Sequence, residues 1–184
     1  MPDTITADHV PVEAGKRDFL LLVTSASAAI AVGSLVWPFV SSMSPAADTL
    51  ALSSIDVDIK PVVVGQGITV VWRGKPVFIR HRTENEIKSA QSVAPNQLIE
   101  PVKDSDRVKL GHEQWLIAIG ICTHLGCIPL GNKPTDTRGD YGGWLCPCHG
   151  SQYDVSGRVR KGPAPANLAL PPYAFMSDTK IKIG

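Results

Sequence analysis

Two short loops that hold every cysteine of the chain constrain its fold more than any other feature. They are Cys122-Thr-His-Leu-Gly-Cys127 and Cys146-Pro-Cys-His-Gly-Ser151, and residues 128–145 separate them. The loops contain all four cysteines and two of the five histidines. One thiolate and one imidazole from each loop make four soft ligands, and one further cysteine per loop is left over. This arrangement favours a metal centre held between the loops and clamped by a disulfide.

The order of the ligands distinguishes between metals. Zinc fingers usually pair two cysteines on one element and two histidines on the next. Here each loop mixes a cysteine with a histidine, as C-x-H and C-x-x-H. A [2Fe–2S] cluster with two cysteines on one iron and two histidines on the other accommodates this mixture. A zinc knuckle and a purely disulfide-bonded pair of loops are the alternatives.

Both loops resemble the cluster-binding boxes of Rieske iron–sulfur subunits of cytochrome bc1 complexes, of the alphaproteobacterial type. Ligation by two cysteines and two histidines is the known property of Rieske centres and enters through that resemblance. The implied metal ligands are Cys122 and Cys146 for one iron and His124 and His149 for the other. A disulfide between Cys127 and Cys148 is implied as well. Both histidines then have a catalytic role, with His149 as the exposed one that meets quinol.

The same resemblance assigns residues that tune or cover the cluster. Ser151 and Tyr153 match positions whose hydroxyls donate to a bridging sulfide and to the Cys122 sulfur. Donors to sulfur stabilise the electron-rich reduced state, so they raise the reduction potential. The segment Gly162-Pro-Ala-Pro165 should be stiff, because proline fixes φ, and should cover the cluster. Contacts with quinol or a partner are expected at Leu125, His149, Gly162 and Pro163.

An uncharged apolar run, residues 19–40, predicts a single transmembrane helix. As a helix it is about 33 Å long at about 1.5 Å per residue, enough to cross a bilayer core. A cleaved signal peptide and a buried helix are the alternatives, but the run is long for a signal peptide and no small-x-small cleavage site follows it. Trp37, near the predicted end of the helix at Pro38, is an interfacial anchor or a simple lipid contact.

Flanking charges predict the orientation of this helix. Lys16 and Arg17 precede it, and the next basic residue is Lys60. By the positive-inside rule, residues 1–18 form a cytoplasmic tail and the head lies on the outer side of the membrane, where a disulfide persists. The resemblance implies a bacterial inner membrane with the head in the periplasm. Lys16-Arg-Asp-Phe-Leu20 also resembles a twin-arginine signal in which Lys replaces the first Arg. That route exports folded proteins, which suits a cluster assembled before translocation.

The rest of the chain divides into a linker and a head domain. Residues 41–54 are small and polar, with too little apolar bulk to pack, so we expect a linker. The resemblance implies that this linker is a hinge, and a mere spacer is the alternative. Residues 55–184 should form a small antiparallel β domain with the cluster loops 122–127 and 146–151 at one tip. The predicted class is therefore mainly β, with one transmembrane helix and a short helical insertion.

Local patterns place the elements of the head. Strands are predicted at residues 55–60, 68–72, 76–79, 115–121 and 181–183. A turn is predicted at residues 73–75 and a loop at 131–143. Residues 80–87 resemble the same region of respiratory Rieske proteins and open a helical insertion of roughly 20 residues. The histidines outside the two loops are taken as structural or surface residues: His9, His81 and His112.

The resemblance implies a function in electron transport. Such a subunit takes one electron, with a proton, from ubiquinol at the outer quinol-oxidation site and passes it to cytochrome c1, which contributes to proton translocation. The expected partners are cytochrome b, cytochrome c1 and ubiquinol in a dimeric bc1 complex. A net charge of +1 gives no indication of nucleic acid. The alternative is a Rieske-type electron carrier of another periplasmic or membrane oxidoreductase, such as an arsenite oxidase.

Sequence features weigh against the rival classes. Soluble ferredoxins that feed oxygenases usually lack a membrane anchor and the surplus cysteines, here Cys127 and Cys148. Membership of the family of arsenite oxidase small subunits would not lead us to expect the sequence found at residues 80–87. A non-redox zinc protein is a third rival, and the colour of the protein together with metal analysis would distinguish it from an iron–sulfur protein.

Overall fold

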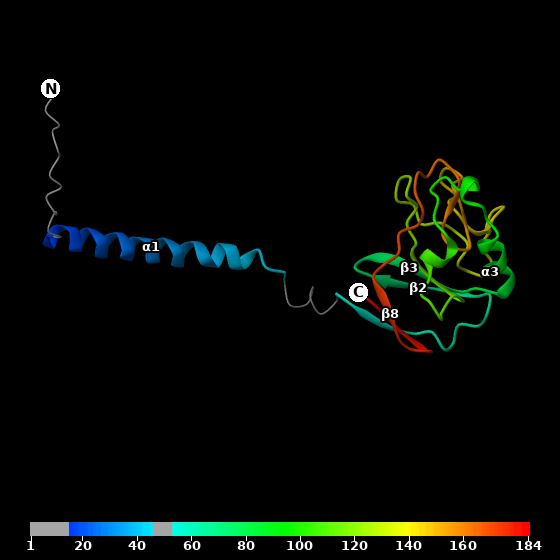
Figure 1. Cartoon of the computed structure of the whole chain (residues 1–184), viewed down its shortest axis with the longest axis horizontal. Helices are drawn as coiled ribbons and strands as arrows, with labels where there is room; N and C mark the ends of the chain where they lie inside the picture. Colours follow the sequence, from blue (N-terminus) through cyan, green and yellow to red (C-terminus); the bar gives the residue numbers. More distant parts are fainter. Residues whose placement is uncertain (1–14, 46–52) are drawn as a thin grey trace, which may run out of the picture. The chain divides into compact units, whose positions relative to one another are not determined.

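The computed structural model describes residues 15–45 and 53–184. The chain divides into two units, residues 1–46 and 47–184, and each is described by itself. The first contains helix α1 (Lys16–Ser42), and the second is the head, which contains the strands (Figure 1). His9, most of the predicted cytoplasmic tail and residues 46–52 of the predicted linker lie outside the described residues.

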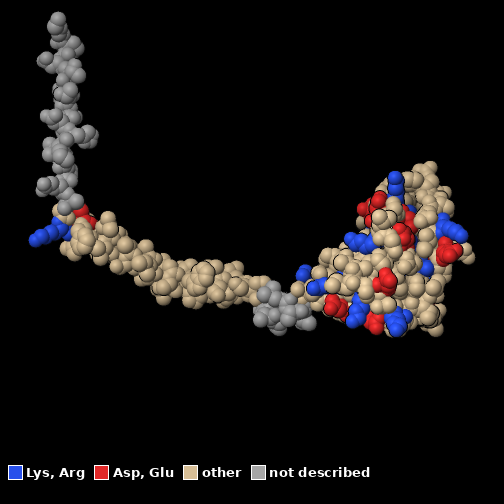
Figure 2. Space-filling model, turned by 60° about the horizontal axis from the view of Figure 1, so that its bottom comes forward, with Lys and Arg blue, Asp and Glu red and all other residues tan. Residues whose placement is uncertain are grey.

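Helix α1 is apolar along nearly all of its length. Its mean hydropathy reaches 2.2, and none of it is buried within the protein. Charged side chains occur only at its N-terminal end (Figure 2). The helix includes residues 19–40 but continues through Pro38 to Ser42, so the prediction that it ends near Trp37 is wrong. By length and composition α1 can cross a membrane.

The head is built from three antiparallel sheets of three strands each, which confirms the mainly β class (Figure 1). The strand orders are β1-β9-β8, β2-β3-β4 and β5-β6-β7. The strands are β1 (Ile55–Asp58), β2 (Gly67–Trp72), β3 (Lys75–His81), β4 (Trp115–Ile119), β5 (Gly142–Leu145), β6 (Gln152–Asp154), β7 (Val159–Lys161), β8 (Tyr173–Ser177) and β9 (Lys180–Ile183).

Strands β3 and β4 contribute to two separate cores. The first core includes Val77, Ile79, Ile117, Ile181 and Ile183. The second includes Phe78, Leu116, Ala118, Cys122, Trp144, Cys146 and Tyr153. Because successive side chains of a strand point to opposite faces, both faces of β3 and β4 are covered. This burial explains the continuous apolar run that predicted a buried strand at 115–121, and it places one face of the sheet against the cysteine loops.

Several local predictions need correction. Strand β4 ends at Ile119 rather than at residue 121, and β5 begins at Gly142, inside the predicted loop 131–143. The β2–β3 turn has two residues rather than three, because Lys75 already pairs with Trp72. Arg73 and Gly74 have φ of 49° and 71°, as the type I′ turns of two-residue hairpins require. The helical insertion also opens later than residue 80, because β3 continues to His81.

The insertion is mostly irregular. Its one α-helix, α3 (Glu84–Gln91), begins after the N-cap Thr83, whose side chain and that of Glu86 form a capping box. Two 3-10 helices follow, η1 (Pro95–Gln97) and η2 (Asp104–Arg107). The sequence therefore predicted a helix correctly, but the helix is shorter than the insertion. Side-chain contacts with the sheets hold the rest of the insertion in place.

Two histidines outside the loops have structural roles, as predicted. The His81 ring stacks on Trp115 with centroids 4.0 Å apart, and its Nδ1 lies 2.9 Å from the Val62 carbonyl oxygen. The His112 ring stacks on Phe175 at 3.8 Å. The His81 ring therefore packs against strand β4 and lies beside Val62, and the His112 ring packs against strand β8.

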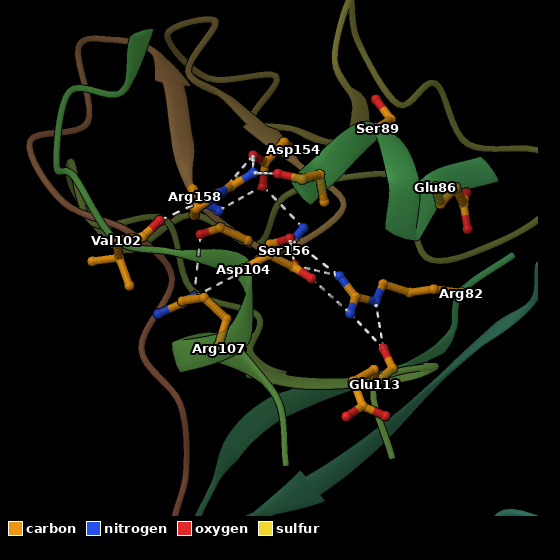
Figure 3. A network of polar contacts seen from close by, with 12 residues as sticks. Arg82, Glu86, Ser89, Val102, Asp104, Arg107, Glu113, Asp154, Ser156 and Arg158 are labelled. Atoms are coloured by element: carbon orange, nitrogen blue, oxygen red, sulfur yellow. Dashed lines mark hydrogen bonds and ion pairs between the residues drawn. The ribbon is translucent and has the colours of Figure 1, made fainter. Parts of the chain in front are cut away.

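A buried polar network joins the insertion to the segment that follows the second cysteine loop (Figure 3). The Arg82 guanidinium donates to the Asp104 carboxylate at 2.6 Å, and the Ser156 hydroxyl donates to the same carboxylate. Arg158 donates to Asp154 at 2.8 Å and to the backbone oxygens of residues 90 and 102. Arg107 donates to the Ser156 carbonyl at 3.0 Å. The insertion is thus fixed on the β6–β7 turn.

Candidate metal centre

The two cysteine loops close by the same pair of backbone hydrogen bonds. In the first, the Cys122 N–H donates to the Cys127 carbonyl at 2.7 Å, and the Gly126 N–H donates to the Cys122 carbonyl at 3.0 Å. In the second, the Cys146 and Gly150 N–H groups make the equivalent bonds, at 2.8 and 3.0 Å. Gly126 and Gly150 have φ of 84° and 77°, a left-handed conformation that glycine adopts without strain. The two loops therefore close in the same way, although the histidine is the second residue after Cys122 in the first loop and the third after Cys146 in the second.

The structure brings the four predicted ligands together in two pairs. Cys122 and Cys146 are both 2% exposed and belong to one core. The His124 and His149 rings lie 4.7 Å apart between centroids, nearly perpendicular at 87°. The Nδ1 atom of His124 is buried without a hydrogen-bond partner. A buried nitrogen lone pair beside a second imidazole and two buried thiols suits a metal cluster, since an unpaired buried polar atom is otherwise costly.

Hydrogen bonds converge on the Cys122 sulfur. The Tyr153 hydroxyl donates to it at 3.2 Å. Burial by itself raises the pKa of the Cys122 thiol, but bonds with the Tyr153 hydroxyl, the His124 amide, the Cys146 thiol and the Ser151 hydroxyl outweigh it and lower that pKa. Ser151 and Tyr153 are both fully buried. These donors stabilise negative charge on sulfur, which is the charge that a thiolate ligand carries.

The Cys146 sulfur lies in a less favourable place for a free thiolate. Burial raises the pKa of its thiol to about 12, although the Cys148 amide opposes the rise. A thiolate at such a position needs a compensating cation. The difference between the two core cysteines suits ligation by iron better than it suits free thiols.

The two surplus cysteines lie close to one another. The sulfur atoms of Cys127, Cys146 and Cys148 all fall within 4.8 Å of each other. The four cysteines are free thiols in the structure, and a hydrogen bond with Cys148, ahead of burial, raises the pKa of Cys127. The predicted Cys127–Cys148 disulfide stays a prediction, which this proximity supports.

The proline-containing segment 162–165 contacts both cysteine loops. The Ala164 N–H donates to the Ser151 hydroxyl at 2.9 Å. The Thr123 hydroxyl donates to the Ala166 carbonyl at 2.6 Å, and the Thr123 N–H donates to the Tyr153 hydroxyl at 3.2 Å. Sequence reasoning did not single out Thr123. Its position between two predicted ligands, as the only hydroxyl of the first loop, was the available signal.

Several residues expected to meet quinol or a partner are exposed near these loops. Leu125 is 71% exposed. His149 and Pro163 are exposed, and Gly162 is half-buried. The loops thus combine two buried cysteines with an exposed leucine and one exposed imidazole.

Comparison with protein families agrees with this geometry. Residues 58–173 match the Rieske [2Fe-2S] domain. Residues 7–46 match the family described as "Ubiquitinol-cytochrome C reductase Fe-S subunit TAT signal". The antiparallel sheets and the paired cysteine–histidine loops therefore define an iron–sulfur domain of the Rieske class.

Curated relatives narrow this class to one family. The chain is 57% identical over 179 residues to the ubiquinol-cytochrome c reductase iron-sulfur subunit of Rhodospirillum rubrum, which covers 97% of both chains. It is 53% identical to the subunit of the same name from Bradyrhizobium diazoefficiens, over 100% of both. A chain of a hyperthermophilic respiratory Complex III is 26% identical with a TM-score of 0.53, covering 88% of this chain and 97% of that one. The chain belongs to the family of ubiquinol–cytochrome c reductase iron–sulfur subunits.

Proposed function

We propose that this chain is the Rieske subunit of a bacterial cytochrome bc1 complex, which takes one electron, with a proton, from ubiquinol and passes it to cytochrome c1. The observation that carries the proposal is that each loop contributes one buried cysteine and one histidine, and that the two histidine rings lie side by side with one of them exposed. A site for quinol chemistry needs both features, since the ligands must be protected while one imidazole reaches the substrate.

The donor set supports the ligands that the resemblance implies. Cys122 and Cys146 would hold one iron, and His124 and His149 would hold the other through ring nitrogens. Cys127 and Cys148 form a disulfide that ties the two loops together. When bound, the [2Fe–2S] cluster supplies a one-electron acceptor of raised potential, because neutral imidazoles replace two thiolates.

The protein's own groups set the conditions for electron transfer. The Tyr153 and Ser151 hydroxyls stabilise negative charge at the Cys122 sulfur, and this raises the reduction potential. The exposed imidazole of His149 accepts a hydrogen bond from the hydroxyl of ubiquinol and receives its proton at the ring nitrogen that binds no metal. His124 is the less exposed of the two rings and mainly serves as a ligand.

The exposed apolar groups around the loops position the quinol and the docking partner. Leu125 and Pro163 lie on the surface and Gly162 lies half-buried beside Pro163. Apolar contacts exclude water from the hydrogen bond at His149, which strengthens that bond. We assign these residues to contacts with the quinone ring and cytochrome b.

The domain plan follows from the anchor and the head. Residues 1–18 form a cytoplasmic tail with a twin-arginine-like signal, 19–40 span the membrane, 41–54 form a hinge and 55–184 form the periplasmic head. Support comes from the apolar helix α1 with Lys16 and Arg17 at its N-terminal end. The hinge lets the head move between cytochrome b and cytochrome c1 in a dimeric complex of the bacterial inner membrane.

The test is expression of the chain in a bacterium that lacks its own Rieske subunit. Membranes should regain ubiquinol–cytochrome c reductase activity and show, after reduction, the low-temperature EPR signal of a Rieske cluster. A Cys146→Ala variant is the matched control and should lose both. Zinc in place of iron, or a Rieske signal without restored activity in an assembled complex, would contradict the proposed function.

A further inference from the structure

The proline-containing loop follows strand β7 (Val159–Lys161), and Asn167 lies at the far end of this loop. We infer that Asn167 is a positioning residue for the cluster site, held by Glu100 of the helical insertion, and that it fixes the hydroxyl donors at the Cys122 sulfur. This inference rests on the proposed function, because it concerns the tuning of the same cluster.

Asn167 closes the base of the loop. Its side-chain oxygen accepts a hydrogen bond of 2.8 Å from the Val159 N–H, so the two ends of the excursion 160–166 are held together. Asn167 is only 7% exposed and Val159 is fully buried. A buried bond across the neck of a loop restricts all the residues between its ends.

Glu100 holds Asn167 from the other side. Its carboxylate accepts from the Asn167 N–H at 2.6 Å, and its carbonyl oxygen accepts from the Asn167 side-chain amide at 3.3 Å. The first bond has an ionised acceptor, so it is stronger than a neutral one. The insertion is itself fixed on the β6–β7 turn by Arg82, Arg107 and Arg158. Through Glu100 it therefore also contacts the proline-containing loop.

The chemistry of position 167 requires an amide. The side chain must accept from the Val159 N–H and donate to the Glu100 carbonyl at the same time. Among short side chains, asparagine carries both an acceptor and an N–H donor in a fixed geometry. Aspartate would keep the acceptor, lose the donor and place a second carboxylate beside Glu100. Leucine of similar shape would lose both bonds.

The restriction reaches the sulfur through two hydroxyls. The held loop supplies the Ala164 N–H, which donates to the Ser151 hydroxyl, and the Ala166 carbonyl, which accepts from Thr123. The Thr123 N–H donates in turn to the Tyr153 hydroxyl. Tyr153 donates to the Cys122 sulfur, and the Ser151 hydroxyl contributes to the lowered pKa of the Cys122 thiol, so a displaced loop weakens both effects. The expected consequence is a lower reduction potential with the ligands unchanged.

The experiment compares Asn167→Asp, Asn167→Leu and the double variant Asn167→Asp/Glu100→Gln in the full chain within its membrane complex. Asn167→Asp and Asn167→Leu should retain iron but show a midpoint potential shifted below that of the unaltered protein in EPR-monitored titrations. The double variant should recover most of the shift, because glutamine removes the carboxylate repulsion and keeps an acceptor for the backbone N–H. Amide exchange at Ala164 and Ala166 should accelerate about tenfold in Asn167→Leu, as expected for losing buried hydrogen bonds.

Two controls separate the possible outcomes. Glu84→Gln alters an exposed carboxylate of the same insertion and should change neither potential nor exchange. Tyr153→Phe reports on the tuning itself. If Tyr153→Phe lowers the potential but the Asn167 variants lower only the thermal stability, Asn167 is merely structural and the inference is overturned. If the Asn167 variants and Tyr153→Phe all leave a Rieske cluster at its original potential, these hydroxyls do not tune the cluster and the inference is overturned. A missing cluster in the unaltered protein overturns the proposed function instead.

Discussion

The Tyr153 hydroxyl donates a hydrogen bond of 3.2 Å to the Cys122 sulfur, and both residues are buried in the same core. Strand β6 carries Tyr153, and the first cysteine loop carries Cys122, 31 positions away in the chain. The sheet thus supplies a donor that the loop could not provide for itself. Because the bond is buried, its effect on charge at the sulfur is larger than it would be in water.

Tyr153→Phe should lower the reduction potential by about 60 mV. A hydrogen bond to a charged group contributes roughly 1.5 kcal/mol, and a tenfold change in a one-electron equilibrium corresponds to about 59 mV. Iron content should not change, since Tyr153 is not a ligand. Redox titration followed by EPR gives the potential. An unaltered potential would mean that the hydroxyl does not donate to sulfur in the loaded protein.

Cys127→Ser should weaken retention of the cluster and lower its potential. Removal of the proposed disulfide frees the two ligand loops from one another, so the cluster becomes more exposed to solvent. Cys148→Ser and the double variant should give the same iron content and potential as Cys127→Ser, because the two residues act as one bond. Iron analysis and mass spectrometry of alkylated protein check this. Two alkylatable thiols in the loaded wild type would remove the disulfide from the account.

Asp104→Ala should lower the free energy of unfolding of the head by about 3 to 5 kcal/mol, since it leaves the buried Arg82 guanidinium without its carboxylate. Both side chains are almost completely buried, at 0% and 2% exposure. Denaturant unfolding measures the change. Glu84→Gln, which breaks an exposed pair with Lys88 at 3.7 Å, should cost less than about 0.5 kcal/mol. Equal effects of the two variants would contradict the importance of the network.

Stability should fall in alkaline solution partly through Tyr173. Burial raises the pKa of this phenol from 10.0 to about 12, although Arg107 and Arg82 oppose the rise. Below pH 10 both the folded and the unfolded states keep the proton, and the contribution is complete. Between pH 10 and about 12 the unfolded state loses the proton first, so the free energy of unfolding declines. Tyr173→Phe should decline less over that window in pH-dependent unfolding. A parallel decline of both proteins would show that Tyr173 is not responsible.

Local sequence patterns were sufficient for much of the architecture. The spacing of cysteine and histidine in the two loops indicated the metal centre, because ligands a few residues apart must share one turn. Alternation at Ile55, Val57 and Ile59 predicted a strand, and the structure has one at β1 (Ile55–Asp58), although it stops one residue before Ile59. The uncharged run 19–40 predicted a helix because its length and composition are local properties. The proline at 38 misled the prediction of its end, since an apolar helix continues past it.

Contacts between distant segments were decided only by the tertiary structure. The bond between Asn167 and Glu100 joins residues 67 positions apart, and that between Arg82 and Ser156 joins residues 74 apart. No periodic pattern in the sequence links the two members of either pair, so the sequence did not indicate which residues would bond to each other. Thr123 lies within the first cysteine loop, but its partners lie on β6 and on the proline-containing loop, so the sequence did not indicate them. The sequence by itself predicted a cluster site and the residues that would hold the cluster. The packing of sheets and insertion decided which hydroxyls and amides surround it, because a hydrogen bond forms only where the fold places donor and acceptor within about 3 Å of each other.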